Sequence, residues 1–386
     1  MNHQSETCIG VLGGGQLGRM LALEARRMGL RVLQWTGGDA SGAARLADQA
    51  LTESFDCDET LENFITQSDV VTVEFENIPK ELLQKVSGRL PLMPSVRPVS
   101  ICQNRELEKN FLAENGIPTA QFRIVDDAES LKGALSEISG DVILKTVESG
   151  YDGKGQMLVP DNADRSSAEE IWNSFGDTRA IVEERINLSA ELSVMVVRAQ
   201  TGEITTYDPA ENQHKNHILD VSIVPARMPE SLLKEAQDIA SKVAESLDYV
   251  GIMGVEFFLN ETGDLLVNEM APRPHNSGHH TLDACESSQF EQQARVICGL
   301  PLGSTNLLRP AVMVNLLGDL WVDATTPPDW TPVLTTPGAK LHLYGKLHAK
   351  PGRKMGHITI LGDTIEQALS RANKCREAYG LSAIED

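Results

Sequence analysis

Residues 150–156, with the sequence GYDGKGQ, combine three glycines with a lysine. Glycine lets backbone N–H groups approach a ligand closely, and successive N–H groups beside an ammonium group suit an oligophosphate. The strand-like run 141–145 brings Lys145 to a strand end just before this segment. The segment therefore predicts a phosphate-binding loop, although a flexible hairpin with a solvated lysine also fits it.

Two carboxylates in a predicted hairpin could hold a metal ion. Strand 251–259 carries Glu256, and the returning strand 264–270 carries Glu269. The expected register places Glu256 opposite Val267, with Glu269 as a diagonal neighbour on the same face. Charges within apolar strands cost free energy unless they are paired, and Mg²⁺ prefers oxygen ligands that it shares with phosphates. The pair predicts a Mg²⁺ (or Mn²⁺) site, with a solvated sheet face as the alternative.

Two further segments concentrate groups that could position an anionic substrate. Segment 271–280 follows the hairpin directly, and its prolines stiffen a turn from which polar side chains project. Its three histidines lack the spacing of a zinc motif. Segment 346–354 places four cations in nine residues of an acidic protein. A phosphate or sugar-phosphate site fits this second segment at least as well as a solvated loop.

The N-terminal region predicts an α/β unit that could carry a ligand site. Residues 8–35 read as a strand, a glycine-rich turn, an amphipathic helix and a second strand. Gly13, Gly15 and Gly18 match the dinucleotide pattern G-x-G-x-x-G, but the second strand ends without the acidic residue that binds a ribose hydroxyl. Arg19, in the first helical turn, fits either an anion held with the helix N-terminus or a surface arginine.

Carboxylates also follow the predicted strand 68–75, which ends near Glu74 and Glu76. Open α/β sheets bind ligands at the carboxyl ends of their strands, and capping of the next helix is the alternative. Residues 94–104 are expected to be a linker that closes a first domain. Short β-runs at 311–317, 338–344 and 357–361 predict a β-rich C-terminal region.

Composition limits the function classes. The chain has 386 residues, which predicts two or three domains. A net charge of −21 argues against a nucleic-acid surface. Six scattered cysteines without a C-x-x-C pair fit reduced thiols in the cytoplasm. A polar N-terminus predicts no signal peptide, and no apolar run reaches the roughly 20 residues that a membrane span needs.

Together, the 150–156 loop, the Glu256/Glu269 hairpin and the run APRPHNSG at 271–278 resemble the ATP-grasp enzymes. Within them, the chain is similar to the N5-carboxyaminoimidazole ribonucleotide synthetase family, which GGGQLGRM at 13–20, VEFENIP at 73–79 and KPGRK at 350–354 also fit. The resemblance covers nearly the whole chain. It implies an α/β preATP-grasp domain (1–104), a two-lobed ATP-grasp domain (105–300) and a small β-rich C-terminal domain (301–386).

The resemblance implies a reaction as well. 5-Aminoimidazole ribonucleotide (AIR), bicarbonate and ATP would give N5-carboxyaminoimidazole ribonucleotide, ADP and phosphate through carboxyphosphate, in purine biosynthesis. Because phosphoryl transfer depends on positioning and charge neutralisation, Mg²⁺ and fixed cations are expected, together with a lid that excludes water. A homodimer is also implied.

The resemblance assigns residues to these tasks. Catalytic roles fall to Arg273, Lys145 and Asp152, and metal binding to Glu256 and Glu269. ATP contacts are implied for Arg105, Lys145, Gly150, Tyr151, Asp152, Gly153, Lys154, Gly155, Gln156, Glu183, Glu184, Arg185, Ile186, Glu191, His214, Asn268 and Glu269. Contacts to AIR or bicarbonate are implied for Glu76, Tyr151, Asp152, Arg273, His275, Asn276, Ser277, Lys346 and Arg353.

Three alternatives stay open from the sequence. The first is another ATP-grasp ligase or carboxylase, such as a formate-using enzyme or a biotin carboxylase. The second is a nicotinamide dehydrogenase built on the glycine turn 13–18, and the third is a non-catalytic nucleotide-binding module. The sequence also departs from the family pattern at 34–36, where relatives often carry Asp-Pro, and at His280, where a tryptophan is expected.

Overall fold

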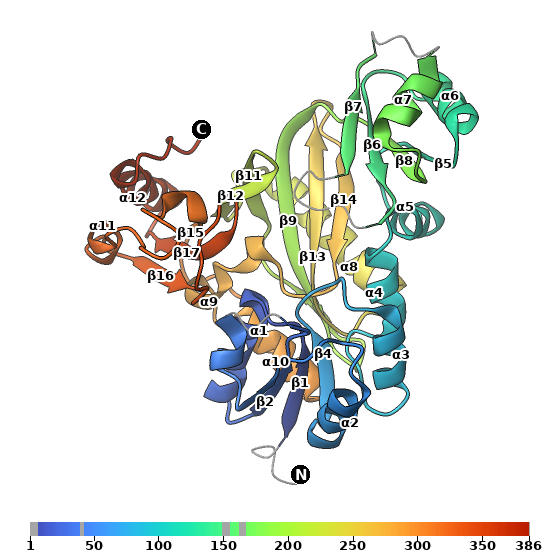
Figure 1. Cartoon of the computed structure of the whole chain (residues 1–386). Coiled ribbons are helices and arrows are strands. Elements are labelled where there is room, and N and C mark those ends of the chain that lie inside the picture. The colour runs from blue at the N-terminus through green and yellow to red at the C-terminus, as the bar shows by residue number, and fades with distance from the viewer. Residues whose placement is uncertain (1–6, 39–41, 149–154, 162–166, 386) are drawn as a thin grey trace.

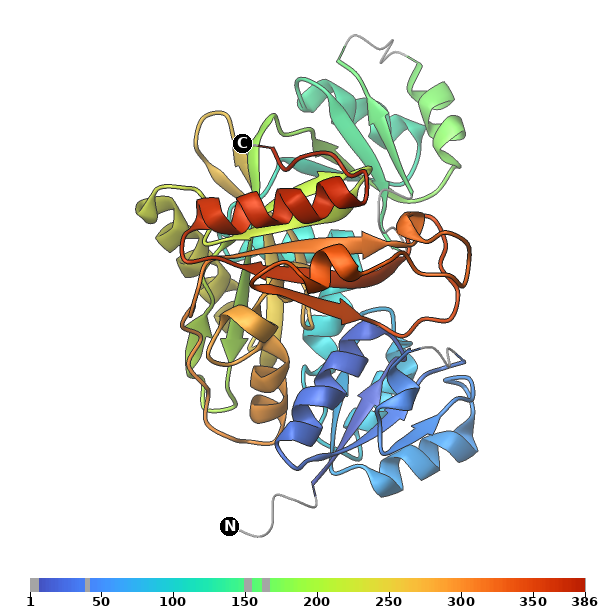
Figure 2. The ribbon, with the colours of Figure 1, turned by 90° about the vertical axis from the view of Figure 1, so that its left-hand side faces the viewer.

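A computed structural model describes residues 7–38, 42–148, 155–161 and 167–385. These residues form three sheets, and Figures 1 and 2 show them as an N-terminal domain at one end, a small lobe at the other and a long sheet between them. None of the helices that the structure describes has the length and apolar character to span a membrane.

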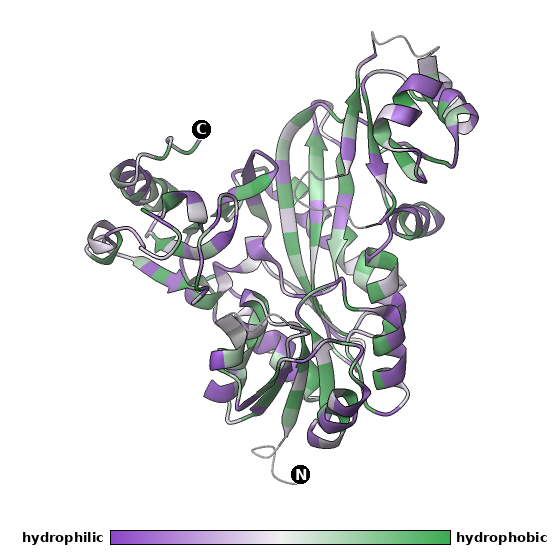
Figure 3. Ribbon diagram, in the orientation of Figure 1, coloured by the Kyte–Doolittle hydropathy of each residue, from purple (hydrophilic) through white to green (hydrophobic). Residues whose placement is uncertain are grey.

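The N-terminal domain is a parallel sheet with the strand order β3-β2-β1-β4. Its strands are β1 (Cys8–Leu12), β2 (Arg31–Trp35), β3 (Gln49–Leu51) and β4 (Val70–Val73). Helix α1 (Gln16–Arg27) packs on one face together with α10 (Gln289–Ile297), while α2 (Asp58–Gln67) and α3 (Lys80–Ser87) pack on the other. Both faces are covered, and the strands are accordingly mostly apolar (Figure 3).

The glycine-rich turn of this domain is filled by a side chain of the protein itself. The buried Glu74 accepts hydrogen bonds from the backbone N–H groups of Gly15 (2.7 Å) and Gly18 (3.0 Å). These are the N–H groups that a dinucleotide pyrophosphate would need. Arg19 instead donates to the carbonyl of Gly42. The glycine turn therefore serves internal packing, which removes the basis of the dehydrogenase alternative.

The segment 94–104 is not a plain linker as expected, because it contains helix α4 (Val96–Cys102), which packs on α5 (Arg105–Glu114). The small lobe follows, with the strand order β5-β8-β6-β7. Its elements are β5 (Phe122–Val125), α6 (Ala128–Glu137), β6 (Val142–Thr146), β7 (Gln156–Val159), α7 (Ala168–Phe175) and β8 (Ala180–Glu184). The helices cover the apolar face of this sheet.

The long sheet has the strand order β14-β13-β9-β11-β12-β15-β17-β16, and β10 pairs with β9. Its first part contains β9 (Leu188–Arg198), β10 (Ile204–Thr206), β11 (Ala210–Lys215), β12 (Ile218–Val224), β13 (Gly251–Asn260) and β14 (Leu265–Ala271), and α8 (Glu230–Ser246) packs against it. The predicted hairpin of strands 251–259 and 264–270 is thus confirmed.

The C-terminal strands continue this same sheet, because β15 pairs with β12. They are β15 (Ala311–Leu317), β16 (Ala339–Leu343) and β17 (Lys354–Leu361), and α12 (Ile365–Ala378), which sequence reasoning missed, covers them (Figure 2). The connecting elements are η2 (Gly42–Arg45), η4 (Asn276–Gly278), α9 (Thr281–Ala284), η5 (Gly318–Leu320) and α11 (Thr331–Leu334).

The filled glycine turn makes a testable prediction. A methyl group at Gly18 would overlap the side chain of Gln34, which is packed beside Glu74. We expect Gly18→Ala to lower the free energy of unfolding by about 1–3 kcal/mol, because overpacking a tight core forces side chains from their preferred positions. Urea denaturation followed by circular dichroism measures the change.

The matched control is Gly133→Ala in α6, where an added methyl group meets no atom within 4 Å. This change should stabilise the protein slightly, by about 0.5–1 kcal/mol, because alanine favours a helix interior. Equal effects of the two substitutions would contradict the packing role of Gly18.

Candidate active site

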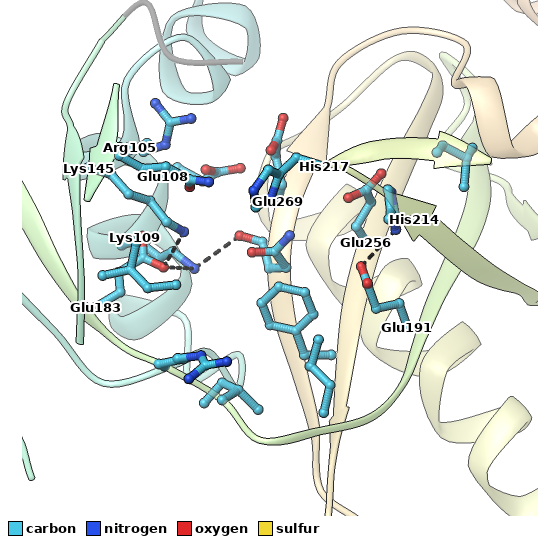
Figure 4. A pocket seen from close by; sticks show the side chains of 18 of the residues that line it. Arg105, Glu108, Lys109, Lys145, Glu183, Glu191, His214, His217, Glu256 and Glu269 are labelled. Carbon is cyan, nitrogen blue, oxygen red and sulfur yellow. Dashed lines mark hydrogen bonds and ion pairs between the residues drawn. The ribbon is translucent and has the colours of Figure 1, made fainter. Parts of the chain in front are cut away.

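A cavity of about 630 Å³ lies between the small lobe and the long sheet. Figure 4 shows Lys145 and Glu183 on one wall, with Glu256, Glu269 and His214 on the other. The predicted site residues that line it are Glu76, Arg105, Lys145, Gln156, Glu183, Glu184, Arg185, Ile186, Glu191, His214, Glu256, Asn268, Glu269, Arg273, His275 and Asn276. The fold thus brings together groups from positions 76 to 276 of the chain.

On the small-lobe wall, a buried carboxylate is neutralised by two lysines. Lys145, on β6, donates to Glu183 on β8 at 2.9 Å, and the ammonium of Lys109 lies 3.8 Å from the same carboxylate oxygen. Burial alone would raise the pKa of Glu183, but the charges of Lys109 and Lys145 lower it to about 2. This wall therefore keeps fixed charges in place before any ligand binds.

The carboxylate hairpin differs in register from the prediction. Glu256 on β13 pairs directly with Glu269 on β14 rather than with Val267, because a β-bulge at Asn268 adds one residue to β14. Burial, and next the charge of Glu269, raises the pKa of Glu256 to about 7. Two facing carboxylates that repel each other are a donor set that a hard divalent cation would stabilise.

A fixed histidine lies against one of these carboxylates. The backbone N–H of Ser277 donates to Nδ1 of His275, so Nε2 carries the hydrogen and faces Glu256 at 3.2 Å. Burial, and then the charge of Arg273, lowers the pKa of His275 well below its ordinary value, so the imidazole is neutral. Ser193 holds Ser277 by a hydrogen bond of 2.7 Å. His275 is thus oriented from behind the cavity wall.

Two further pairs complete the walls. His214 on β11 lies 3.1 Å from Glu191 on β9. Arg273 pairs through Nε with Glu76, which follows β4 of the N-terminal domain. Although burial lowers the pKa of Arg273, the charge of Glu76 raises it above its ordinary value, so this guanidinium is a permanent cation. The pair joins the N-terminal domain to the loop after β14.

Models of known families match three successive segments of the chain. Residues 6–103 match the ribonucleotide synthetase preATP-grasp domain, residues 110–290 the ATP-grasp domain, and residues 311–371 the phosphoribosylaminoimidazole carboxylase C-terminal domain. The N5-carboxyaminoimidazole ribonucleotide synthase of Bacillus subtilis is 44% identical over 353 residues, which span 92% of this chain and 91% of that protein. The chain belongs to the N5-carboxyaminoimidazole ribonucleotide synthase family.

Solved structures of the family agree with this assignment. The ADP complex of one N5-carboxyaminoimidazole ribonucleotide synthetase is 43% identical, with a TM-score of 0.88 over 96% of each chain. The synthase from Aspergillus clavatus, in complex with ADP and 5-aminoimidazole ribonucleotide, is 30% identical. Its TM-score is 0.86, with 98% of this chain and 100% of that chain covered. The ATP-grasp fold expected from the sequence, with its N-terminal and C-terminal domains, is thus confirmed.

Some residues that the family resemblance assigned do not line the cavity. Ser277 is buried behind His275, and Gly155 lies just before β7 and does not line the cavity. Lys346 donates to the carbonyl of Lys354, and Arg353 to that of His348, both in the C-terminal domain. Gly150, Tyr151, Asp152, Gly153 and Lys154 lie outside the described residues.

Other cavity residues were missed by sequence reasoning. Among them are Glu108, Lys109, His217 and Lys354. Lys354 belongs to the basic run 346–354, so the concentration of cations in that run could have predicted its place at the site. Glu108 and Lys109 lie inside an ordinary amphipathic helix, where charged residues usually face solvent. Among the described residues, no cluster of three or more His, Cys, Asp or Glu side chains forms a metal site.

The charge balance at Glu183 makes a pH-dependent prediction. The pKa of Glu183 falls from an ordinary 4.5 to about 2 in the folded protein. The ionised Glu183, paired with its two lysines, therefore stabilises the fold above pH 4.5. The contribution is lost as the pH falls towards 2. We expect Glu183→Gln to lower the free energy of unfolding by about 2–4 kcal/mol at pH 7. The difference in this free energy from wild type should shrink between pH 4.5 and pH 3. Urea denaturation across this range measures it.

Glu170→Gln, at an exposed position of α7, is the control and should match the wild type at pH 7. If the loss of unfolding free energy in Glu183→Gln stays constant down to pH 3, the role of the Glu183 charge is contradicted.

Proposed function

We propose that the protein carboxylates 5-aminoimidazole ribonucleotide with bicarbonate, at the expense of ATP, and forms the N5-carboxyamino product, ADP and phosphate. It is an ATP-dependent ligase of purine biosynthesis that forms a C–N bond. The observation that carries the proposal is the single cavity where a cation-lined small-lobe wall, a facing carboxylate pair and the polar loop 273–276 meet. The relative from Aspergillus clavatus, solved with ADP and AIR, has the same fold over 98% of this chain.

The small-lobe side suits ATP. Arg105 and Lys145 supply cations beside the strand end that leads to the loop 150–156. Residues 183–186 form the strand end and linker between the lobes, where backbone groups can read an adenine edge. The remaining contacts proposed are Gly150, Tyr151, Asp152, Gly153, Lys154, Gly155, Gln156, Glu191, His214, Asn268 and Glu269. The phosphates of ATP are expected to be shielded from water on this side of the cavity.

Glu256 and Glu269 would hold Mg²⁺, or Mn²⁺ in its place. The fit rests on their direct pairing across β13 and β14 and on the raised pKa of Glu256, whose largest causes are burial and its carboxylate neighbour. The ion would neutralise phosphate charge during phosphoryl transfer. Neutral His275 keeps Glu256 oriented from behind.

The substrate side is built on the loop after β14. Asn276 is 6% exposed and lines the cavity, yet neither its Nδ2 nor its Oδ1 has a partner among the described residues. Unsatisfied buried amides are costly, so a ligand with donor and acceptor groups would complete this site. We assign AIR and bicarbonate to Asn276, Glu76, Arg273 and His275. Tyr151, Asp152, Lys346 and Arg353 complete the assignment, and Ser277 would act through His275, behind which it is buried.

In the reaction, phosphorylation of bicarbonate gives carboxyphosphate, which delivers its carboxyl carbon to the exocyclic amine of AIR. Arg273 would neutralise this intermediate, and its contacts support this role, because Glu76 fixes the guanidinium through Nε and Nη1 donates to the carbonyl of Pro274. We also propose that the protein is cytoplasmic and forms a homodimer. Each chain would consist of three domains, 1–104, 105–300 and 301–386.

Release of ADP should depend on AIR. In a coupled assay with ATP, Mg²⁺ and bicarbonate, we expect addition of AIR to raise the rate at least 10-fold, since binding of the second substrate completes the site. A rate that AIR leaves unchanged, but that formate or biotin raises, would support another ATP-grasp ligase instead.

Arg273→Ala should lower kcat about 10²–10³-fold, with a much smaller change in the KM for ATP, because a fixed cation acts mainly on charge that develops in the reaction. Steady-state kinetics measures both constants. Arg309→Ala, which removes an exposed arginine paired with Asp363, is the control and should retain wild-type kinetics. An equal loss in both variants would contradict the assignment.

A further inference from the structure

Helix α5 contacts the outer edge of β14 at two points that flank Glu269. Glu108 accepts a hydrogen bond from the backbone N–H of Met270 at 2.6 Å. Lys109, the next residue along the helix, donates to the backbone carbonyl of Asn268 at 3.0 Å. Both side chains are almost completely buried, at 3% and 2% exposure. Two adjacent residues of one helix thus hold the backbone before and after the same carboxylate.

This arrangement is required by the position of β14 in the sheet. β14 is the end strand, so one of its edges has no partner strand. Segment 117–119 covers part of that edge, since Val267 donates to the carbonyl of Pro118 and accepts from the hydroxyl of Thr119. Beyond Val267, where the β-bulge lies, side chains of α5 contact this edge.

The bulge makes the two contacts important for the site. A β-bulge lacks regular ladder hydrogen bonds and is free to bend, and this one determines whether Glu269 faces Glu256. Metal ligands need to be held within a few tenths of an ångström by the groups around them. A bulge beside a metal ligand therefore needs support from outside the ladder.

We infer that Glu108 and Lys109 are positioning residues that clamp the bulged backbone of β14 and so aim Glu269 at the metal ion. The inference rests on the proposed function of Glu269 as a metal ligand and adds two residues that hold it in place. Lys109 also lies 3.8 Å from Glu183 and bonds Thr119. The same clamp thus connects the metal strand with the ATP wall of the small lobe.

The test is a Mg²⁺ titration of AIR-dependent ADP formation at saturating ATP, AIR and bicarbonate. Glu108→Ala removes the acceptor for the Met270 N–H, and we expect the half-saturating Mg²⁺ concentration to rise at least 10-fold. Glu108→Gln retains an oxygen that can accept this hydrogen bond, and its value should stay within 3-fold of wild type. Glu114→Gln, at an exposed position of the same helix, is the matched control and should match the wild type.

A second measurement separates the clamp from general destabilisation. Calorimetric titration with ADP in EDTA should give the same affinity for wild type and Glu108→Ala within 3-fold, since the hydrogen bond that is lost holds the strand of the metal ligand and leaves the small-lobe wall in place. If Glu108→Ala does not fold, Lys109→Met tests the other half of the clamp. It should raise both the half-saturating Mg²⁺ concentration and the KM for ATP, because Lys109 also faces Glu183.

Three outcomes would overturn the inference. In the first, Glu108→Ala or Lys109→Met leaves the Mg²⁺ requirement within 2-fold of wild type. In the second, Glu108→Gln is as impaired as Glu108→Ala, which would make the charge rather than the hydrogen-bond acceptor responsible. In the third, ADP affinity in EDTA falls in parallel with the Mg²⁺ response.

The proposed metal site is judged separately by Glu269→Gln. Loss of the Mg²⁺ response in this variant supports the metal role of Glu269 whatever Glu108→Ala does. A Glu269→Gln enzyme with an unchanged Mg²⁺ response would overturn that role and the clamp with it.

Discussion

The free-energy cost of keeping carboxylates away from water governs this structure. A charge in a poorly hydrated site needs an opposite charge or several hydrogen bonds. Glu183 forms ion pairs with two lysines, and Glu76 forms one with Arg273. Glu74 accepts hydrogen bonds from backbone N–H groups at the start of α1. Each of these three contacts also joins parts of the chain that lie far apart in the sequence. The electrostatic balance and the arrangement of the domains therefore depend on each other.

The carboxylates of Glu256 and Glu269 face each other, and each repels the charge of the other. The neighbours of this pair are a neutral histidine and the more distant charges of His214 and Lys354, and the pKa of Glu256 remains raised by burial and by Glu269. A divalent cation, as proposed for this pair, would relieve the repulsion. Such a cation would also make an acidic protein, with a net charge of −21, suited to an anionic nucleotide.

Much of the fold and site followed from the sequence because the signals were local. Apolar strand patterns predicted the β13–β14 hairpin, and the family resemblance implied most of the cavity residues. The missed features depend on tertiary contacts. The bulge at Asn268 arises from pairing between strands, and the role of Glu74 arises where β4 ends beside α1. Likewise, Glu108 and Lys109 have the pattern of any solvated pair on a helix until β14 packs against them.

The pairing of β12 with β15 has a consequence for how the chain can be divided. β12 is apolar and is covered on one edge by β11 and on the other by β15. A protein cut before residue 311 would present the second edge of β12 to solvent as a row of unpaired N–H and C=O groups. Such open, apolar edges recruit strands from other molecules. The C-terminal region therefore also protects the protein from aggregation through this strand edge.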